Sequence, residues 1–171
     1  MPDVWNVQKV NEDLLRKFQK IQGELFTCET VAELCEKLLQ QMGQEFNIPF
    51  FWLTLIDEPA TAYLKKELLL SSYLAERLNL INRDSFTEIV GKNTAPVLTN
   101  ENVTPFYRLL PGSTKYFIRS FAICPLAFGT TVMGSINCGD PSATRYQPGM
   151  DTTLLNALMQ KVSIRLAYFI V

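Results

Sequence analysis

The chain has 171 residues, a length typical of one domain, and its 47 % hydrophobic and 19 % charged residues exclude a disordered protein. Its net charge is −1 and its basic residues do not cluster beyond Lys65-Lys66, so we expect no nucleic-acid partner, because neutralising phosphates requires a concentrated basic face. Histidine is absent, which removes Ser-His and Cys-His nucleophile pairs and the commonest metal ligand.

Two amphipathic helices are predicted at the start of the chain. Residues 4–26 carry apolar side chains at spacings of three and four, which form one helical stripe: Val7, Val10, Leu14, Phe18, Ile21 and Leu25. A second helix is predicted from Thr30 to Phe46, because Thr30 and Glu33 form a capping box. Cys35 lies inside the apolar stripe of this second helix, so we expect it in the core.

Pro49 marks the boundary before a predicted strand, Phe50–Ile56. This run of aromatic and branched residues suits a strand covered on both faces. A second strand is indicated near Tyr63–Leu70, where a helix remains an alternative. Residues 72–82 favour a short helix.

Shorter elements are predicted before the last third of the chain. Ser85 and Glu88 form another capping box, which opens a helical turn that Gly91 closes. We also expect a short strand over Ala95–Thr99, a helical turn over 105–110 and a loop at Gly112-Ser113.

A hairpin is predicted from strands Arg119–Phe128 and Thr131–Gly139, joined at Gly129-Thr130. With a two-residue turn, Cys124 lies opposite Ser135 and Cys138 lies opposite Phe121. Because side chains alternate between faces, Cys124 and Cys138 are then expected on opposite faces, where they form no disulfide.

The same register sorts the hairpin into two faces. One is almost entirely apolar and is expected to pack under helices: Phe121, Ile123, Pro125, Val132, Gly134, Ile136 and Cys138. The other is mixed and can line a cavity: Ala122, Cys124, Leu126, Met133, Ser135 and Asn137. The alternative, in which Ser135 and Asn137 only bond to neighbouring backbone, is equally compatible with the sequence.

The chain closes with a Pro- and Gly-marked loop and one long helix from about Asp151, which serves as an N-cap. Four cysteines occur, Cys28, Cys35, Cys124 and Cys138, and none belongs to a CxxC motif. We therefore expect free core thiols and no metal site. The sequence carries no secretory signal pattern and no run of about 18 apolar residues, so we expect a cytoplasmic protein without a membrane span.

The last third resembles a GAF domain, a small-molecule sensor module. Arg119-Ser120-Phe121-Ala122-Ile123-Cys124-Pro125-Leu126 resembles the GAF strand that ends in an apolar-Pro-Leu step. Val132-Met133-Gly134-Ser135-Ile136-Asn137-Cys138 resembles the returning strand. The following segment, Asp140-Pro141-Ser142-Ala143-Thr144-Arg145-Tyr146-Gln147-Pro148-Gly149-Met150-Asp151, is similar to bacterial GAF-like proteins catalogued only as a domain of unknown function.

The resemblance implies an α+β fold with a central antiparallel sheet of five or six strands. Helices from both chain ends would cover one face, and the middle of the chain would cover the other. It also implies a division into an N-terminal dimerisation or signalling helix, residues 1–27, and a GAF-like domain, residues 28–171. Cysteines 124 and 138 projecting to the same side would count against this assignment.

The resemblance also bears on cofactors. The Asn-Lys-x-x-x-Phe-Asp-Glu string of cyclic-nucleotide-binding GAF domains is absent, and so is a cysteine or histidine placed for a bilin or haem. We therefore expect no cofactor and no cyclic nucleotide.

Three functions remain open. The first is a non-enzymatic sensory or regulatory module that signals through a homodimer of its terminal helices. Its unidentified small molecule would sit between the mixed sheet face and residues 60–115, against Trp52, Thr54, Tyr107, Arg108, Cys124, Met133, Ser135 and Asn137. The second is a dimerisation scaffold with a filled interior. The third is a thiol reductase, similar to the GAF-fold enzymes that act on free methionine sulfoxide, with Cys124 as nucleophile; the predicted separation of Cys124 from Cys138 argues against it.

Overall fold

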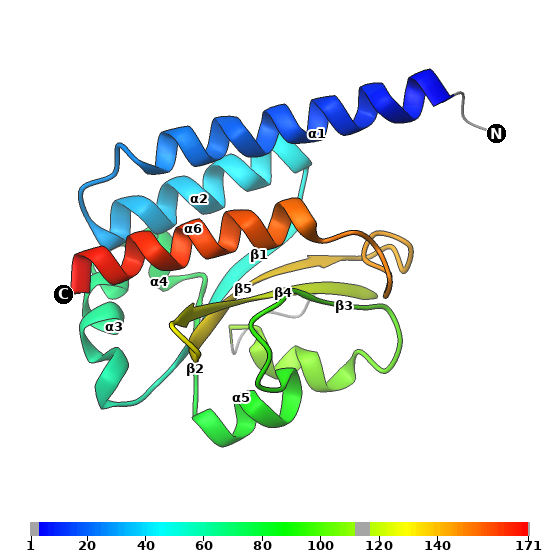
Figure 1. Cartoon of the computed structure of the whole chain (residues 1–171). Coiled ribbons are helices and arrows are strands. Elements are labelled where there is room, and N and C mark those ends of the chain that lie inside the picture. The colour runs from blue at the N-terminus through cyan, green and yellow to red at the C-terminus, as the bar shows by residue number, and fades with distance from the viewer. Residues whose placement is uncertain (1–3, 112–116, 171) are drawn as a thin grey trace.

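The structure, a computed structural model, describes residues 4–111 and 117–170, with side chains from residue 12 onward. Figure 1 shows helices from both ends of the chain lying together over one side of a sheet. The elements in chain order are α1 (Val4–Leu25), α2 (Val31–Phe46), β1 (Phe50–Ile56), η1 (Pro59–Thr61), α3 (Ala62–Leu69), α4 (Ser72–Ala75), β2 (Leu78–Ile81), α5 (Arg83–Val90), β3 (Val97–Thr99), η2 (Thr104–Leu109), β4 (Ser120–Phe128), β5 (Thr131–Asp140) and α6 (Thr153–Ile170).

The sheet has five strands in the order β2-β1-β5-β4-β3. Strand β5 pairs antiparallel with both β1 and β4, and β3 pairs antiparallel with β4. Strand β2 runs parallel to β1, so the expected antiparallel sheet is in fact mixed at this edge. The predicted number of strands is confirmed.

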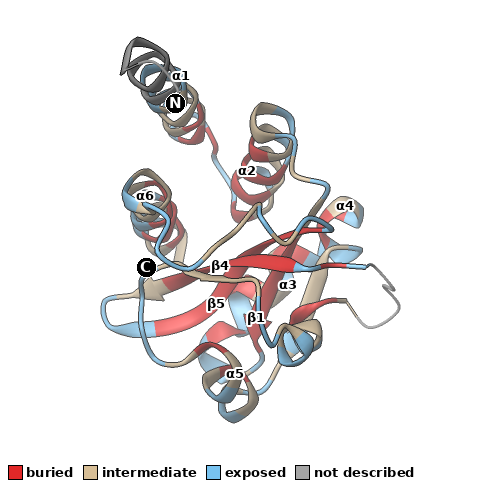
Figure 2. Cartoon of the chain, turned by 90° about the vertical axis from the view of Figure 1, so that its right-hand side faces the viewer, coloured by how far each residue is buried: buried red, intermediate tan, exposed pale blue. Residues whose placement is uncertain are grey.

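Two buried layers enclose this sheet. The terminal helices cover one face as the resemblance implies, but α3 and α4 from the middle of the chain lie with them rather than on the other face. The helix-side core lies between the sheet and α1, α2 and α6, and it continues to α3 and α4 through Leu64, Leu68 and Leu74. The opposite core lies under α5 and η2, where Phe86 and Leu109 are buried against Phe121. Figure 2 shows the buried strands between α6 and α2 on one side and α5 on the other.

The predicted helix over 72–82 is wrong in its second half. Helix α4 ends when the backbone N–H of Arg77 donates to the carbonyl of Leu74 at 2.9 Å. The next four residues become strand β2 because they pair with the edge of β1, from Leu53↔Leu78 to Ile56↔Ile81. In the segment 63–70 the helix that the sequence allowed as an alternative is the one formed.

The start of α5 also differs from the prediction. Its N-cap is Asn82, whose side-chain oxygen accepts a hydrogen bond from the backbone N–H of Ser85 at 2.8 Å, so the predicted Ser85–Glu88 box does not open the helix. Gly91 closes α5 as expected, at φ 88°, a conformation that favours glycine. The predicted strand and helical turn that follow are formed as β3 and η2, whereas the predicted loop at 112–113 lies outside the described residues.

The hairpin forms, but its register departs from the prediction after two pairs. Phe128↔Thr131 and Ala127↔Val132 follow the two-residue turn, and a bulge then makes Leu126 pair with Gly134. Met133 is the extra residue, and an extra residue on one strand reverses the facing of all that follow. Cys124 therefore lies opposite Ile136, not Ser135, and Cys138 lies opposite Ala122, not Phe121.

This bulge overturns the predicted separation of the two cysteines. Ile136 belongs to the helix-side core together with Cys124, and Cys138 lies two residues further along the same face of β5. The expectation that such a placement would count against a GAF-like assignment is also wrong. The hairpin and the closing helix α6 are both present, and one inserted residue accounts for the shared face.

Candidate functional site

The space in which a ligand was expected is occupied by an aromatic cluster. Phe121 is fully buried at its centre. Trp52 and Tyr107 contact it edge-on, with ring centroids 6.0 and 5.7 Å away, and Phe106 stacks on it at 5.8 Å. These separations are those of packed aromatic pairs. Residues of β1, β4 and η2 thus fill the interior between the sheet and its cover.

The predicted polar ligand contacts are used inside the protein. The hydroxyl of Ser135 donates to Asn137 Oδ1 at 2.7 Å, and Asn137 Nδ2 donates to Thr54 Oγ1 at 2.8 Å. We call these three buried residues the polar chain.

The polar chain ends at one backbone carbonyl. The hydroxyl of Thr54 donates to the carbonyl oxygen of Leu109 at 3.0 Å, and Trp52 Nε1 donates to the same oxygen at 2.6 Å. Tyr107 is also engaged, since its hydroxyl donates to the carbonyl of Ile118 at 2.6 Å and accepts from the Ile118 N–H at 2.8 Å. The partners of Ser135 and Asn137 are side chains rather than the neighbouring backbone considered from the sequence.

The structure brings five of the eight predicted ligand contacts together on this face: Trp52, Thr54, Tyr107, Ser135 and Asn137. Arg108 is exposed on η2, and its backbone carbonyl accepts from Asn79 Nδ2 at 3.0 Å. Cys124 and Met133 belong to the helix side of the sheet, which the bulge explains.

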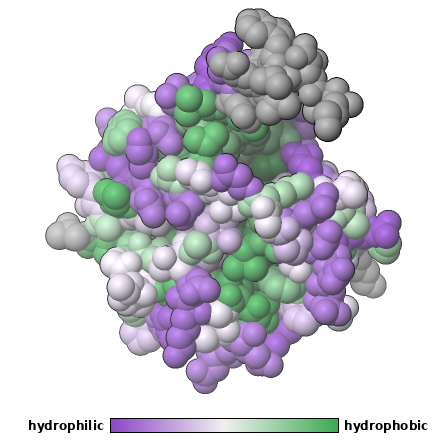
Figure 3. Space-filling view, turned by 45° about the vertical axis from the view of Figure 1, so that its right-hand side comes forward, coloured by the Kyte–Doolittle hydropathy of each residue, from purple (hydrophilic) through white to green (hydrophobic). Residues whose placement is uncertain are grey.

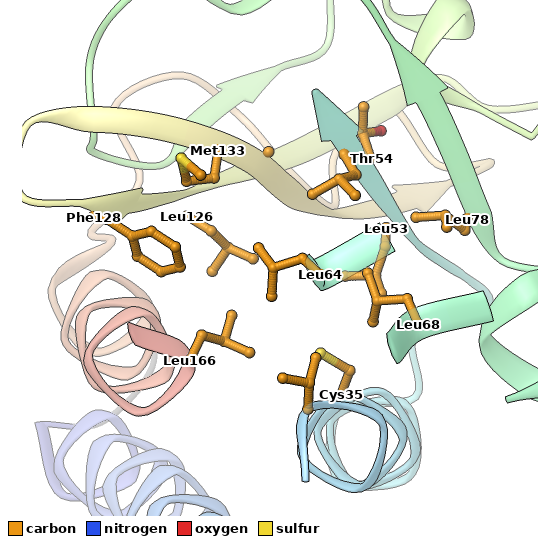
Figure 4. A pocket seen from close by; sticks show the side chains of 13 residues that line it. Cys35, Leu53, Thr54, Leu64, Leu68, Leu78, Leu126, Phe128, Met133 and Leu166 are labelled. Carbon is orange, nitrogen blue, oxygen red and sulfur yellow. The ribbon is translucent and has the colours of Figure 1, made fainter. Parts of the chain in front are cut away.

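A small cavity lies on that helix side, and Figure 4 shows the side chains around it. Its volume is about 20 Å³, and Met133, Leu126, Phe128, Cys35 and Leu166 are among the residues that line it. The walls are apolar, so a cavity of this size gives a water molecule no partners and holds no larger ligand.

The four cysteines are free and buried. Burial raises the pKa of the Cys138 thiol and of the Cys35 thiol to about 12, and it raises the pKa of Cys124 well above its usual range. Thiols with such pKa values carry almost no thiolate at neutral pH. Within residues 4–111 and 117–170, no group of three or more His, Cys, Asp and Glu side chains is placed to hold a metal ion.

A larger hollow, not predicted from the sequence, lies at one edge of the sheet. It has a volume of about 360 Å³ and lies where β1 begins, and we call it the edge groove. Its walls come from the end of α2, the start of β1, the end of α4 and Leu110-Pro111; they include Leu39, Gly43, Phe51, Tyr73 and Arg77. No sequence signal marks this groove, because it exists only where β2 starts later than its neighbour β1.

Among the described residues, no helix combines the length and the apolar character needed to cross a bilayer.

Comparison with solved structures shows the fold. The GAF domain of an Acinetobacter phosphoenolpyruvate-protein phosphotransferase is similar with a TM-score of 0.61 and 18 % identity, over 91 % of this chain and 93 % of that one. The corresponding domain from Coxiella burnetii gives a TM-score of 0.65 and 10 % identity, over 92 % and 94 %.

A third similar structure is the free methionine-R-sulfoxide reductase of Neisseria meningitidis in complex with its substrate, with a TM-score of 0.55 and 12 % identity, over 89 % of this chain and 87 % of that one. No curated protein matches the chain. A family model described as "Protein of unknown function, DUF484" matches residues 3–171. The chain therefore belongs to the DUF484 family and has a GAF-like α+β fold.

Proposed function

We propose that this protein is a non-enzymatic regulatory module of the GAF type that responds to a small ligand and signals through a homodimer of its terminal helices. One observation carries the proposal: the apolar stripe of α1 becomes less buried from the C-terminal toward the N-terminal part of the helix. Ile21 and Leu25 are buried, Leu14 and Phe18 are only half-buried, and Leu15 is 43 % exposed. An apolar stripe that loses its cover along a helix suits a partner helix.

Helix α6 offers a second part of the same surface. It lies beside α1, and Ile164 is 71 % exposed on it. Figure 3 shows apolar side chains gathered at the surface among hydrophilic ones. A second copy related by a two-fold axis would cover this surface with the same surface of its own, because such a contact is self-complementary.

Polar contacts connect the proposed dimer surface to the domain. Arg165 of α6 donates from Nη2 to the backbone carbonyl of Cys28 at 2.9 Å, and Lys161 donates to Gln22 Oε1 at 2.8 Å. Helix α6 packs on β4 at the same time. Suppose that a ligand binds two arrangements of the sheet with different affinity. Its binding would then shift the sheet toward one arrangement, and α6 would transmit this change to α1.

The thiol chemistry argues for a non-enzymatic role. A reductase of the free-methionine-sulfoxide type needs an accessible thiolate, and Cys124 and Cys138 are buried thiols with raised pKa values. Because both cysteines lie on one face, their predicted separation no longer argues against a reductase. Their protonated state is the stronger argument against it. The likeness to the Neisseria reductase extends to the fold alone.

Sedimentation equilibrium at micromolar concentration tests the dimer. We expect the mass of two chains for the wild type and of one chain for Ile164→Glu, because a charge would be buried in the interface. Leu70→Glu is the matched control: Leu70 is also 71 % exposed but lies at the end of α3, and this variant should stay dimeric. A wild-type mass of one chain would contradict the proposal.

A second candidate is a dimerisation scaffold that binds no ligand. The filled interior around Phe121 favours it, because the predicted ligand face offers no space. The two candidates differ in whether ligand binding stabilises the protein. A bound ligand raises the free energy of unfolding by about 2.7 kcal/mol at 100 times its Kd, which a thermal-shift measurement detects.

A further inference from the structure

The edge groove contains an unpaired piece of strand edge. In the parallel pairing with β2, the N–H of Leu53 donates to the carbonyl of Arg77 at 2.8 Å, so the odd-numbered residues of β1 point their backbone groups toward this edge. Phe51 is the next such residue, and β2 does not extend far enough to reach it. The N–H of Arg77, which would have met the Phe51 carbonyl, donates to Leu74 instead.

Phe51 therefore presents one backbone donor and one backbone acceptor to the groove, without a partner among the residues that the structure describes. An open strand edge of this kind is the feature that β-augmentation uses, in which an extended peptide adds to the sheet. The edge is short, so it accepts only a few residues of such a peptide.

A cation lies at the side of this open edge. The guanidinium of Arg77 stacks 3.7 Å from the centre of the Tyr73 ring, and its Nη1 donates to the Tyr73 carbonyl at 2.9 Å. These two contacts fix the plane of the group. Its Nε and Nη2 have no hydrogen-bond partner within the described part of the chain, which leaves a two-donor fork suited to a carboxylate.

Among the described residues, Glu76 is the acidic side chain that pairs with Arg77, with Oε2 3.8 Å from Nη1. Its side chain is 79 % exposed, and an exposed pair at this distance is worth little and is easily displaced. The groove thus combines a strand edge, a fixed cation and some apolar side chains, such as Ile48 and Tyr73. Its volume of about 360 Å³ falls within the range of ligand pockets.

We propose that the edge groove binds the C-terminal end of an extended peptide, which pairs with the backbone of Phe51 and places its terminal carboxylate on Arg77. This inference rests on the proposed regulatory function, for which it names the ligand. The strand edge supplies hydrogen bonds that any sequence can make, and Arg77 selects a free C-terminus.

The probes are acetyl-Ala-Val-Leu with a free carboxylate, the same tripeptide as its C-terminal amide, and free leucine, each titrated into the ¹⁵N-labelled full chain. We expect the acid to bind, the amide to bind about tenfold or more weakly because it lacks the charge-assisted bonds, and free leucine to bind more weakly still. Hydrogen exchange at the Phe51 amide should slow when the acid is bound.

Arg77→Gln should lower the affinity for the acid to that of the amide, while Arg119→Gln, which changes an exposed arginine outside the groove, should leave it unchanged. Equal affinity for acid and amide, equal affinity for free leucine and tripeptide, or absence of binding at millimolar acid would each overturn the proposal. Sedimentation equilibrium measures the dimer independently of the peptide titration. A failure of peptide binding can therefore be distinguished from a failure of dimerisation.

Discussion

The two faces of the sheet are both closed to water, but by different chemistry. On the helix side a large cluster of apolar side chains forms the core, with Leu34, Leu38 and Ile136 fully buried. On the other side, aromatic rings surround Phe121, and the polar chain of Thr54, Ser135 and Asn137 is buried with them. Buried polar groups on that side are satisfied by one another and by a carbonyl, so their presence does not by itself indicate a ligand site.

The two filled faces also contrast with the rim of the sheet. Both faces are filled, and a hollow lies at the strand edge, where Phe51 and Arg77 have hydrogen-bonding groups without a partner in the described part of the chain. The proposed ligand site therefore lies at the edge of the sheet rather than in its interior.

The largest expected effect concerns the aromatic cluster. Phe121→Ala should lower the free energy of unfolding by about 3–5 kcal/mol, because three rings lose their central partner and a cavity remains. Chemical denaturation measures this change. Phe117→Ala is the control: Phe117 is 74 % exposed, and its removal should change stability by no more than about 0.5 kcal/mol. Similar losses in both variants would show that the cluster is not the packing centre of this face.

A smaller effect separates the two faces at adjacent positions. Asn137→Ala should cost about 2–3 kcal/mol, because the hydroxyls of Ser135 and Thr54 each lose a buried partner. Cys138→Ala, on the helix side, removes one buried sulfur atom and should cost about 1 kcal/mol. Urea unfolding of both variants tests the contrast. If Asn137→Ala lowered the free energy of unfolding no more than Cys138→Ala does, the hydrogen bonds of the polar chain would add nothing to stability.

The smallest effect lies outside both cores. Arg83 holds Glu58 through Nε to Oε2 at 3.1 Å and through Nη2 to Oε1, and these hydrogen bonds lower the pKa of Glu58 from its ordinary value of 4.5. A lowered folded-state pKa stabilises the fold above pH 4.5, and the gain disappears as pH falls through the folded-state value.

Because the pair is partly exposed, we expect a gain below about 1 kcal/mol. Wild type should exceed Glu58→Gln in unfolding free energy by this amount at pH 7, and the difference should shrink as the pH falls below 4.5. A gap that widens on acidification would contradict the assignment.

The strongly periodic parts of the chain were predictable from sequence. Helices α1, α2 and α6 follow from apolar side chains at spacings of three and four, and β1 and the hairpin follow from branched and aromatic runs around Gly129. The middle of the chain was less predictable. Leu78–Ile81 has only four residues and no clear alternation, and the free edge of β1 decides that it is a strand.

The candidate site was predictable in part. The sequence placed Trp52, Thr54, Tyr107, Ser135 and Asn137 on a common interior, and they do meet. It could not show that their polar groups bond to one another, nor that Cys124 and Met133 lie on the other side, because one bulged residue reverses the facing of the rest of β5.

Sequence by itself determined the long helices, strand β1 and the hairpin, since the periodicity of apolar residues is a local property of the chain. Tertiary structure alone decided which face each β5 side chain takes, whether the interior is filled, and where an edge stays open. Those outcomes depend on register and on the length of a neighbouring strand, which are fixed only when distant segments pair.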